Sequence, residues 1–535
     1  MKVLILGGTG VFGSRLARLL ARDGHQITIA ARSLGPAEAL ANELGGTALQ
    51  IDRTGDLSAL HGHCVVVDAA GPFQAYGEDP YRLAKAALAA NAHYLDLADT
   101  AAFCAGITAL DPAARAANKA AISGLSSVPA ISSAAVRALA GTDRPLHIDS
   151  AILPGNRSPR GLSVMASILS QAGRPFSTWR AGQWVRATGW SEPQDYALSG
   201  DLTRQAWRIE VPDIRLFPAH FGASTVDFRA GLELGFMRYG LAAFALFRRV
   251  CPIPVTPTLV RAFHLAATLL APFGTGTGGM SVSITTATHR HSWTLLAEDG
   301  DGPYVPAIAA RALLRRPTLP TGATPALEIV TLEEIEAAMS DLSIRFERHS
   351  GPLDPIFPRI LGPAFATLPE PIRATHLTAG ATRWQGRASV TRGSGLFSLF
   401  LAALFRFPPA TDDTEVEVIK TPTTAGETWT RRFGSRTFRS HLQATAKGMT
   451  ERFGPFTFLL GLTVRDDALH YPVTAGHLGP LPLPRWMLPR SEAREYVADG
   501  RFHFDVRLLA PLTGGLLVHY RGHLTPARSQ SPASV

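Results

Sequence analysis

Short apolar runs alternate with amphipathic segments along the first third of the chain. Val3 to Leu6 is too short for a helix and is typical of a buried strand, whereas Leu16, Leu19 and Leu20 recur at helical spacing. The same pattern predicts further strands at 25–31, 47–52, 64–70, 93–99 and 120–125, with helices near 37–44, 80–92 and 112–118. Strict alternation of strand and helix predicts an α/β fold with a doubly wound parallel sheet of the Rossmann type, within residues 1–130.

Residues 131–302 have a mixed pattern that predicts an α+β substrate domain inserted into the chain. Strand-like stretches at 146–152, 280–284 and 292–297 flank an apolar segment, 232–273, which arginines interrupt. It lacks the run of about 18 uncharged apolar residues that a membrane span requires. A buried helix pair or a homodimer interface is the favoured interpretation, and an interfacial helix that contacts a membrane peripherally or admits a hydrophobic substrate is the alternative.

Helical signals return over 303–349, which we expect to complete the N-terminal domain. Thr331 and Glu334 have the spacing of a capping box at the start of one of these helices. Residues 356–528 then predict a mostly antiparallel β domain, because 415–419, 428–433, 456–464, 502–508 and 516–524 alternate with the period of a strand. A concave sheet face that holds a hydrophobic ligand and a purely structural sheet are both open for this last domain.

The glycine turn behind the first strand is the strongest chemical signal. Gly8, Gly10 and Gly13 form a GxGxxG motif between a strand and a helix, a context that predicts a bound dinucleotide. We expect Gly8 to permit the tight turn, Gly10 to let the backbone approach the diphosphate, and Gly13 to let the helix pack closely on the strand. The free N–H groups of the first helical turn then face the phosphates.

The end of the second strand indicates which cofactor binds. Arg32 and Ser33 stand where an enzyme that uses NAD carries a carboxylate, and a guanidinium suits the 2′-phosphate of NADP. Asp52 is expected on the adenine side of the cofactor. The turn after the fourth strand is expected at the carboxyl edge of the sheet, where ligands bind. The residues predicted to contact NADP are Gly8, Thr9, Gly10, Val11, Phe12, Gly13, Arg32, Ser33, Asp52, Ala70, Gly71, Pro72 and Phe73.

Hydride transfer to a carbonyl or imine also needs a proton donor. Asp96, Asp99 and Tyr94 lie at the carboxyl end of the fifth predicted strand and are the catalytic candidates by position. The alternative for Asp96 is a structural role, in which its carboxylate caps or pairs with a neighbouring loop. No Gly-x-Ser-x-Gly, Cys-x-x-Cys or His-Glu-x-x-His motif occurs, so no metal site is expected.

The cysteine content and the distribution of charge indicate the compartment and the class of partner. The three cysteines among 535 residues are too few for a disulfide framework, which favours a cytoplasmic protein, membrane-associated if the 232–273 segment contacts lipid. The formal charge of +9 comes from scattered arginines rather than a basic stripe, so no nucleic-acid partner is expected. Because Met1 and Lys2 lead straight into the first strand, we expect no signal peptide.

Four ordered motifs resemble the saccharopine dehydrogenase-like oxidoreductases: 7–10 (GGTG), 69–73 (AAGPF), 94–96 (YLD) and 124–129 (GLSSVP). The resemblance covers residues 1–349 and implies a Rossmann half, an inserted substrate half and a return to the first. Two departures, Ala98 before Asp99 and the lack of an aspartate near Ser126, count against an amino-acid substrate. Residues 427–431, 452–455, 482–484 and 500–506 resemble a bacterial domain of unknown function that is fused behind such halves.

Two functions therefore remain open. One is an NADP-dependent oxidoreductase acting on a small hydrophobic or lipid-like metabolite. The other is a sensor or scaffold that binds NADP without turnover and signals through the C-terminal domain. The extended substrate domain favours the enzyme.

Overall fold

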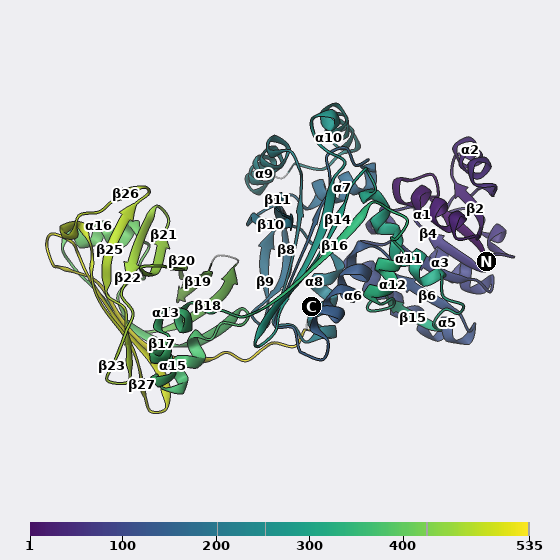
Figure 1. Ribbon diagram of the computed structural model, residues 1–535. Coiled ribbons are helices and arrows are strands. Elements are labelled where there is room, and N and C mark those ends of the chain that lie inside the picture. The colour runs from purple at the N-terminus through teal and green to yellow at the C-terminus, as the bar shows by residue number, and fades with distance from the viewer. Residues whose placement is uncertain (201, 252, 424–425, 533–535) are drawn as a thin grey trace. The chain divides into compact units, whose positions relative to one another are not determined.

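The computed structural model describes residues 1–200, 202–251, 253–423 and 426–532, which form two compact units (Figure 1). The first unit comprises Met1–Trp179, Trp184–Ile284 and Arg290–Ser350. The second comprises Arg180–Gln183, Thr285–His289 and Gly351–Val535. Each unit is described by itself below.

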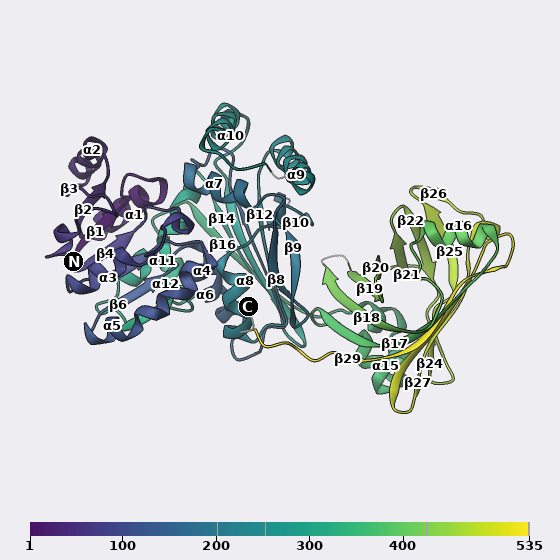
Figure 2. The ribbon, with the colours of Figure 1, turned by 180° about the vertical axis from the view of Figure 1, so that it is seen from behind.

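The first unit begins with a seven-stranded parallel sheet in the order β15-β6-β5-β4-β1-β2-β3 (Figure 2). Its strands are β1 (Lys2–Leu6), β2 (Gln26–Ala31), β3 (Thr47–Gln50), β4 (Val65–Asp68), β5 (His93–Asp96), β6 (Ala120–Ser123) and β15 (Gly322–Pro325). Its helices are α1 (Val11–Arg22), α2 (Leu34–Leu44), α3 (Arg82–Ala89), α4 (Ala101–Gly106), α5 (Asp111–Ala116) and α6 (Ser132–Ala140). The doubly wound α/β prediction is confirmed, and the strand order reverses between β1 and β4, where such sheets bind ligands.

A second seven-stranded sheet has the order β10-β11-β12-β7-β13-β14-β16. Its strands are β7 (His147–Leu153), β10 (Gln194–Ser199), β11 (Leu202–Arg208), β12 (Thr225–Gly231), β13 (Gly278–Thr285), β14 (His289–Ala297) and β16 (Ile344–Pro352). Strands β8 (Pro175–Arg180) and β9 (Gln183–Thr188) form a separate pair, and the helices are α7 (Leu162–Gln171), α8 (Pro212–Phe221), α9 (Gly235–Val250) and α10 (Pro257–Leu270).

The 303–349 segment, expected to complete the first sheet, is shared between both sheets. Strand β15 joins the first sheet beside β6, but β16 forms an edge of the second sheet. Between them, helix α12 (Leu332–Ala337) starts with the predicted capping box, in which the Thr331 side chain accepts from the Glu334 N–H and the Glu334 side chain accepts from the Thr331 N–H. The segment therefore joins the two sheets rather than returning wholly to the first.

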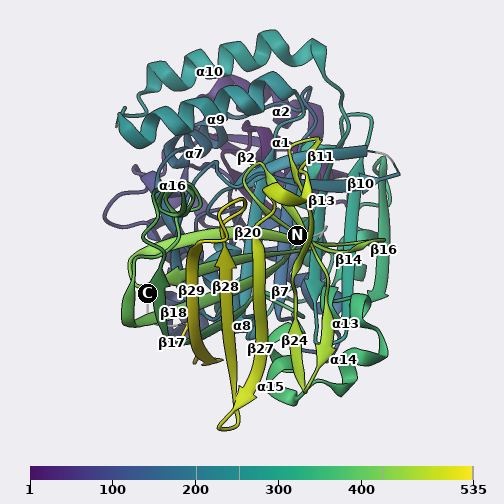
Figure 3. The same cartoon turned by 90° about the vertical axis from the view of Figure 1, so that its left-hand side faces the viewer.

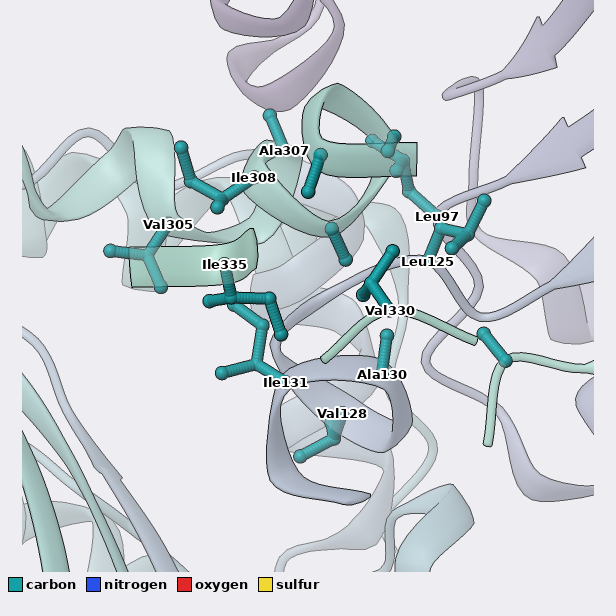
Figure 4. Close-up of a cluster of buried hydrophobic side chains, with 14 of the residues drawn as sticks. Leu97, Leu125, Val128, Ala130, Ile131, Val305, Ala307, Ile308, Val330 and Ile335 are labelled. Atoms are coloured by element: carbon teal, nitrogen blue, oxygen red, sulfur yellow. The ribbon is translucent and has the colours of Figure 1, made fainter. Parts of the chain in front are cut away.

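Helix α11 (Val305–Leu314) lies in the core between these elements. Figure 4 shows its Val305, Ala307 and Ile308 packed against side chains from the loop after β6 and from α12. Arg311 of the same helix is 2 % exposed, and its guanidinium donates to both carboxylate oxygens of Asp23 at 2.9 and 2.8 Å. This ion pair anchors the C-terminal end of α1, the helix behind the glycine turn, to α11.

The apolar 232–273 segment forms α9 and α10, with residue 252 outside the described residues. Leu241, Ala245, Val260 and Ala267 are buried, as a packed helix pair requires. The outer faces carry exposed apolar side chains: Phe236, Tyr239, Leu246, Phe247 and Val250 on α9, and Leu265 and Leu269 on α10. No helix among the described residues is long and apolar enough to cross a membrane.

The second unit is built on a 13-stranded sheet whose recorded strand pairs are all antiparallel, as predicted. In spatial order its strands are β23 (Thr463–Arg465), β24 (Ala468–His470), β27 (Arg490–Ala498), β28 (Arg501–Leu509), β29 (Leu516–Pro526), β17 (Thr382–Arg392), β18 (Thr411–Thr423), β19 (Gly426–Phe433), β20 (Arg436–Thr445), β21 (Gly448–Phe453), β22 (Phe456–Leu460), β25 (Val473–Leu478) and β26 (Leu481–Pro482). Its helices are α13 (Ile356–Leu361), α14 (Pro363–Thr367), α15 (Glu370–His376) and α16 (Leu396–Leu404).

Candidate functional site

The turn between β1 and α1 is carried by Gly7 and not by Gly8, which corrects the sequence-based assignment. Gly7 has a φ of +74°, and a Cβ there would lie 2.5 Å from the Cα of Ala70. Gly8 has no positive φ, and its small size instead accommodates Ile29, whose Cγ2 would be 3.0 Å from a Cβ. Gly7 is therefore the turn glycine, because its backbone touches the segment that follows β4 and leaves no room for a side chain.

Gly13 packs against the turn as expected, and Gly10 accepts the first hydrogen bond of α1. A Cβ on Gly13 would lie 2.3 Å from the carbonyl oxygen of Gly7, so only glycine allows this close contact of helix and turn. The first intrahelical bond of α1 runs from the Ser14 N–H to the Gly10 oxygen at 3.0 Å. The N–H groups of Val11, Phe12 and Gly13 precede that bond and are the donors that a helix start leaves for an anion.

A cleft of about 600 Å³ opens at the carboxyl ends of β1, β2 and β4. Of the residues predicted to contact the cofactor, those that line it are Thr9, Gly10, Arg32, Asp52, Ala70, Gly71 and Pro72. The structure therefore brings together the glycine turn, the end of the second strand and the turn after the fourth. This is the switch-point crevice in which an open α/β sheet binds its ligand.

The other predicted contacts lie outside the lining of this cleft. Phe73 is only 6 % exposed and packs with Tyr76 and Phe103, at ring-centroid distances of 5.1 and 5.0 Å. Phe12 packs against the hydrophobic core, and Ser33 is exposed at the start of α2 without capping it. The side chains of Phe73 and Phe12 therefore support the site from behind, since they are drawn into apolar clusters.

Sequence reasoning missed several residues that line the cleft, among them three with polar side chains: Arg53, Thr54 and Tyr76. The Arg53 guanidinium lies 3.5 Å from the centre of the Tyr76 ring. The Asp52 carboxylate accepts from the N–H and hydroxyl of Thr54, at 2.8 and 2.7 Å, which lowers its pKa and directs it toward its own loop. For Arg53 and Thr54 the available signal was their place directly after the third predicted strand, and for Tyr76 it was the nearby turn after the fourth.

Two guanidinium groups, Arg32 and Arg53, thus line the adenosine side of the cleft. Arg32, and not a carboxylate, stands at the end of β2, and the Asp52 carboxylate accepts hydrogen bonds from Thr54. The phosphates of NADP find N–H donors at the start of α1 and cationic side chains at the ends of β2 and β3. The residues present therefore fit NADP.

Asp96 and Tyr94, two of the catalytic candidates, are buried. Asp96 is 0 % exposed and accepts from the N–H of Ala98 at 3.0 Å, the N–H of Gly124 at 2.8 Å and the hydroxyl of Ser123 at 3.0 Å. It thereby fixes the loops that follow β5 and β6, while burial raises its pKa to about 7. Tyr94 is 1 % exposed in the core on the α3 side of the sheet. Neither side chain reaches the surface of the site.

Asp99, the third candidate, lies differently. It follows the carboxyl end of β5 and is accessible to solvent, yet the protein that surrounds it raises the pKa of its carboxyl. The next residue, Thr100, donates to Gln74 Oε1 at 3.3 Å, which joins this loop to the one that lines the cleft after β4. Among the three candidates, Asp99 is the carboxyl that a substrate can reach.

A third carboxyl, Asp213, was not foreseen from the sequence. It lies in the first turn of α8, is 1 % exposed, and neither of its oxygens has a hydrogen-bond partner among the described residues. Burial raises its pKa to about 7, against the opposing effect of the Ser132 hydroxyl. Burial is the main cause of the raised pKa of the Cys104 thiol, and the negative charges of three carboxyls raise it further: Asp96, Asp99 and Asp213. These three carboxyls around Cys104 are called the acidic cluster below.

Replacing Asp213 with asparagine is expected to remove a pH-dependent loss of stability. Because the folded-state pKa is raised to about 7 from 3.8, the native state binds this proton more tightly than the unfolded chain. Wild-type stability relative to the variant should therefore fall as pH rises from about 4 to about 7, by at most about 1.4 kcal/mol per pH unit. Urea unfolding of both proteins at several pH values measures this difference, and parallel curves would contradict it.

Comparisons with known proteins follow the same division of the chain. Residues 3–128 match the family model of the saccharopine dehydrogenase NADP binding domain. Residues 368–524 match a domain of unknown function, DUF4166. A search of curated proteins found no match.

Several solved structures are similar to parts of the chain. Apo saccharopine dehydrogenase (L-Glu forming) from Saccharomyces cerevisiae is 16% identical with a TM-score of 0.45, and the match covers 65% of this chain and 99% of that one. 3-Hydroxyacyl-CoA dehydrogenase type-2 from Mycobacterium avium is 18% identical with a TM-score of 0.20, and the match covers 23% of this chain and 73% of that one. UDP-glucose-4-epimerase from Stenotrophomonas maltophila with bound NAD is 21% identical with a TM-score of 0.17, and the match covers 19% of this chain and 38% of that one.

The resemblance inferred from the sequence motifs is thus confirmed by the family models over residues 3–128 and 368–524. The chain carries a saccharopine dehydrogenase NADP-binding domain at residues 3–128, followed by a DUF4166 domain at residues 368–524.

Proposed function

We propose that this protein is an NADP(H)-dependent oxidoreductase that transfers hydride to or from a hydrophobic, lipid-like metabolite. The observation that carries the proposal is the cleft at the strand-order reversal, with the glycine turn on one side and Arg32 and Arg53 on the other. The N–H groups of 11–13 would hold the diphosphate, and the two guanidinium groups the 2′-phosphate. When bound, the nicotinamide supplies or accepts the hydride.

Asp99 is the proposed proton donor for reduction of a carbonyl or imine. Its carboxyl is accessible, and its raised pKa keeps it protonated further toward neutral pH than an ordinary aspartate. Asp96 acts as a positioning residue, because its three hydrogen bonds fix the loops after β5 and β6. The protein thus supplies a proton and a defined geometry beside the cofactor.

The position and the apolar composition of helix α7 support the proposal of a hydrophobic substrate. A Cβ on Gly161, which precedes α7, would lie 3.7 Å from Val11 Cγ2, so this helix starts beside the glycine turn. Its sequence, LSVMASILSQ, has no charged residue, and Val164, Met165 and Ile168 are only half-buried. Helix α7 in turn packs against α10. An apolar surface therefore continues from the glycine turn toward the exposed apolar faces of α9 and α10.

The exposed faces of α9 and α10 support peripheral contact with a membrane or with a second copy of the chain. Phe236, Phe247 and Leu269 are 67, 53 and 67 % exposed, while Arg249 and Arg261 are exposed on the same helices. Aromatic side chains with arginines beside them are typical of helices that rest in the headgroup region of a bilayer. Such contact would give a lipid-like substrate a direct route to α7.

Steady-state consumption of NADPH tests the enzyme against the alternative, a sensor that binds NADP without turnover. Medium-chain aldehydes, enoyl thioesters and hydrophobic imines are offered to the full-length protein, with short polar analogues as matched controls. We expect turnover with at least one hydrophobic class and little with its polar analogue. Tight NADPH binding with no turnover on any substrate would favour the sensor, and absence of binding would contradict both.

A further inference from the structure

The 13-stranded sheet of the second unit curls around an apolar cavity of about 140 Å³. Strands that stand far apart in the sheet order line the same space: β27 and β28 near one end of the order, β21 and β22 near the other. Figure 3 shows β27, β28 and β29 side by side in one wall. On β28 the lining residues are Phe502, Phe504, Val506 and Leu508, at every second position. The concave face of the sheet is therefore the cavity wall.

Short helices close one end of this cavity. Helix α13 packs on β20 and β21, whereas α15 packs on β27 and β28, so together they bridge the two walls. The Lys420 ammonium, 1 % exposed, donates to the carbonyl of Thr375 in α15 at 2.8 Å and lies 3.9 Å from the centre of the Trp429 ring. His376 Nε2 contacts the Glu495 carboxylate at 2.5 Å. The polar side chains at this end thus join the helices to the sheet.

The arginine and glutamate side chains on the wall have partners within the second unit, and burial lowers the pKa of the Lys420 ammonium to about 7. The Arg431 guanidinium donates to Glu451 at 3.0 Å and to the Ser440 hydroxyl at 2.7 Å. Glu495, besides its contact with His376, accepts from the Tyr471 hydroxyl at 3.2 Å. Because a buried charge is costly unless it is paired, a ligand that brought a net charge into this space would be disfavoured. The chemistry of the wall selects neutral molecules.

The opposite end of the sheet carries α16, as Figures 1 and 2 both show. This helix reads LFSLFLAAL, and Leu396, Phe400 and Leu404 are 87, 64 and 53 % exposed. The chain leaves it through Phe405 and Phe407, which line the cavity. An exposed apolar helix thus runs directly into an apolar interior. A water-insoluble molecule could pass along this surface without crossing a polar rim.

We infer that the DUF4166 domain binds a neutral hydrophobic molecule, with an acyl or prenyl chain, on the concave face of its sheet, and that α16 marks the entrance. A dry cavity of about 150 Å³ lined by aliphatic and aromatic side chains is large enough for a benzene-sized group. The remainder of a longer chain would follow Phe405 and Phe407 toward α16. This site is distinct from the dinucleotide cleft and does not depend on the proposed reaction.

Quenching of tryptophan fluorescence by 12-bromododecan-1-ol tests this inference, because Trp429 lies on the cavity wall. The full-length protein should show saturable quenching. Val418→Phe fills the cavity from β18 and should weaken the apparent affinity at least tenfold, whereas Ile419→Phe points to the other face of the same strand and should not. Ala493→Leu on β27 provides a second filling variant if Val418→Phe unfolds.

Thermal unfolding by circular dichroism identifies a variant that has lost its fold. Non-saturable quenching in the wild type, or wild-type affinity in both folded filling variants, would overturn the inference. NADPH titration of the same samples reports on the dinucleotide cleft alone. Failure of the lipid site and failure of the proposed enzyme are therefore distinguishable.

Discussion

Replacing Asp99 with asparagine is expected to lower kcat for reduction by about 10²-fold or more, since a positioned general acid contributes about 10²–10⁴ in rate. Asparagine keeps the size of the side chain but cannot deliver a proton. In the wild type the rate should fall as pH rises through the raised pKa of Asp99, because the acid is then lost. The variant should lack that limb of the pH profile while its Kd for NADPH stays the same.

Asp143→Asn is the matched control. Asp143 is exposed just beyond α6, at the opposite end of that helix from Ser132 near the acidic cluster, so its loss should leave kcat and the pH profile unchanged. Steady-state rates between pH 5 and pH 9, on the substrate found in the NADPH assay, make the comparison. An Asp99→Asn enzyme with wild-type kcat and an unchanged pH limb would assign the proton to another group, with Asp213 as the next to replace.

Arg32→Glu should reverse the preference for cofactor. The wild-type guanidinium lines the cleft at the end of β2, and a carboxylate in its place would repel a 2′-phosphate and accept from a 2′-hydroxyl. A hydrogen bond to a charged group contributes about 1.5–3 kcal/mol, so with the added repulsion the Kd for NADPH should rise about 100-fold or more. The Kd for NADH should change little.

The control for this experiment is Arg115→Glu, which makes the same change of charge on an exposed side chain that pairs with Asp111 in α5. Isothermal titration with NADPH and NADH gives the two dissociation constants of each protein. Equal losses for both nucleotides in Arg32→Glu would remove the 2′-phosphate role from this residue. Arg53, the second guanidinium of the cleft, would then be the one to test.

The periodicity of apolar residues was enough to predict β1 to β6, the helices α1, α2, α3 and α5, and the antiparallel second unit, because these depend on local strand and helix patterns. It did not predict α4, α6 or β15. It could not assign the turn glycine. The sequence GGTGVFG contains two overlapping motifs, one starting at Gly7 and one at Gly8, and only the contact with Ala70 decides between them. Periodicity also could not decide between the catalytic and the structural role of Asp96, of which the burial of its side chain and its three hydrogen bonds now favour the structural one.

Other parts of the site depend on tertiary contacts that no local pattern encodes. Asp213 stands more than a hundred residues from Cys104, and its sequence context, a proline followed by an acidic residue, indicates only a helix start. Strand β16 has an ordinary strand sequence, and which sheet it joins is fixed by its neighbour β14. The contact of the Arg53 guanidinium with the Tyr76 ring likewise joins loops that follow two different strands.

Strand β15 has a consequence for how the chain is made. It pairs with β6 in parallel register from Gly322 to Pro325, almost two hundred residues after β6 itself. While the ribosome is still synthesising the intervening segment, the nucleotide-binding sheet has an open border at β6, with backbone groups available to neighbouring chains. A shortened protein that stops after residue 150 would keep that border permanently. Safe expression of the dinucleotide-binding half therefore requires the chain to extend past residue 325.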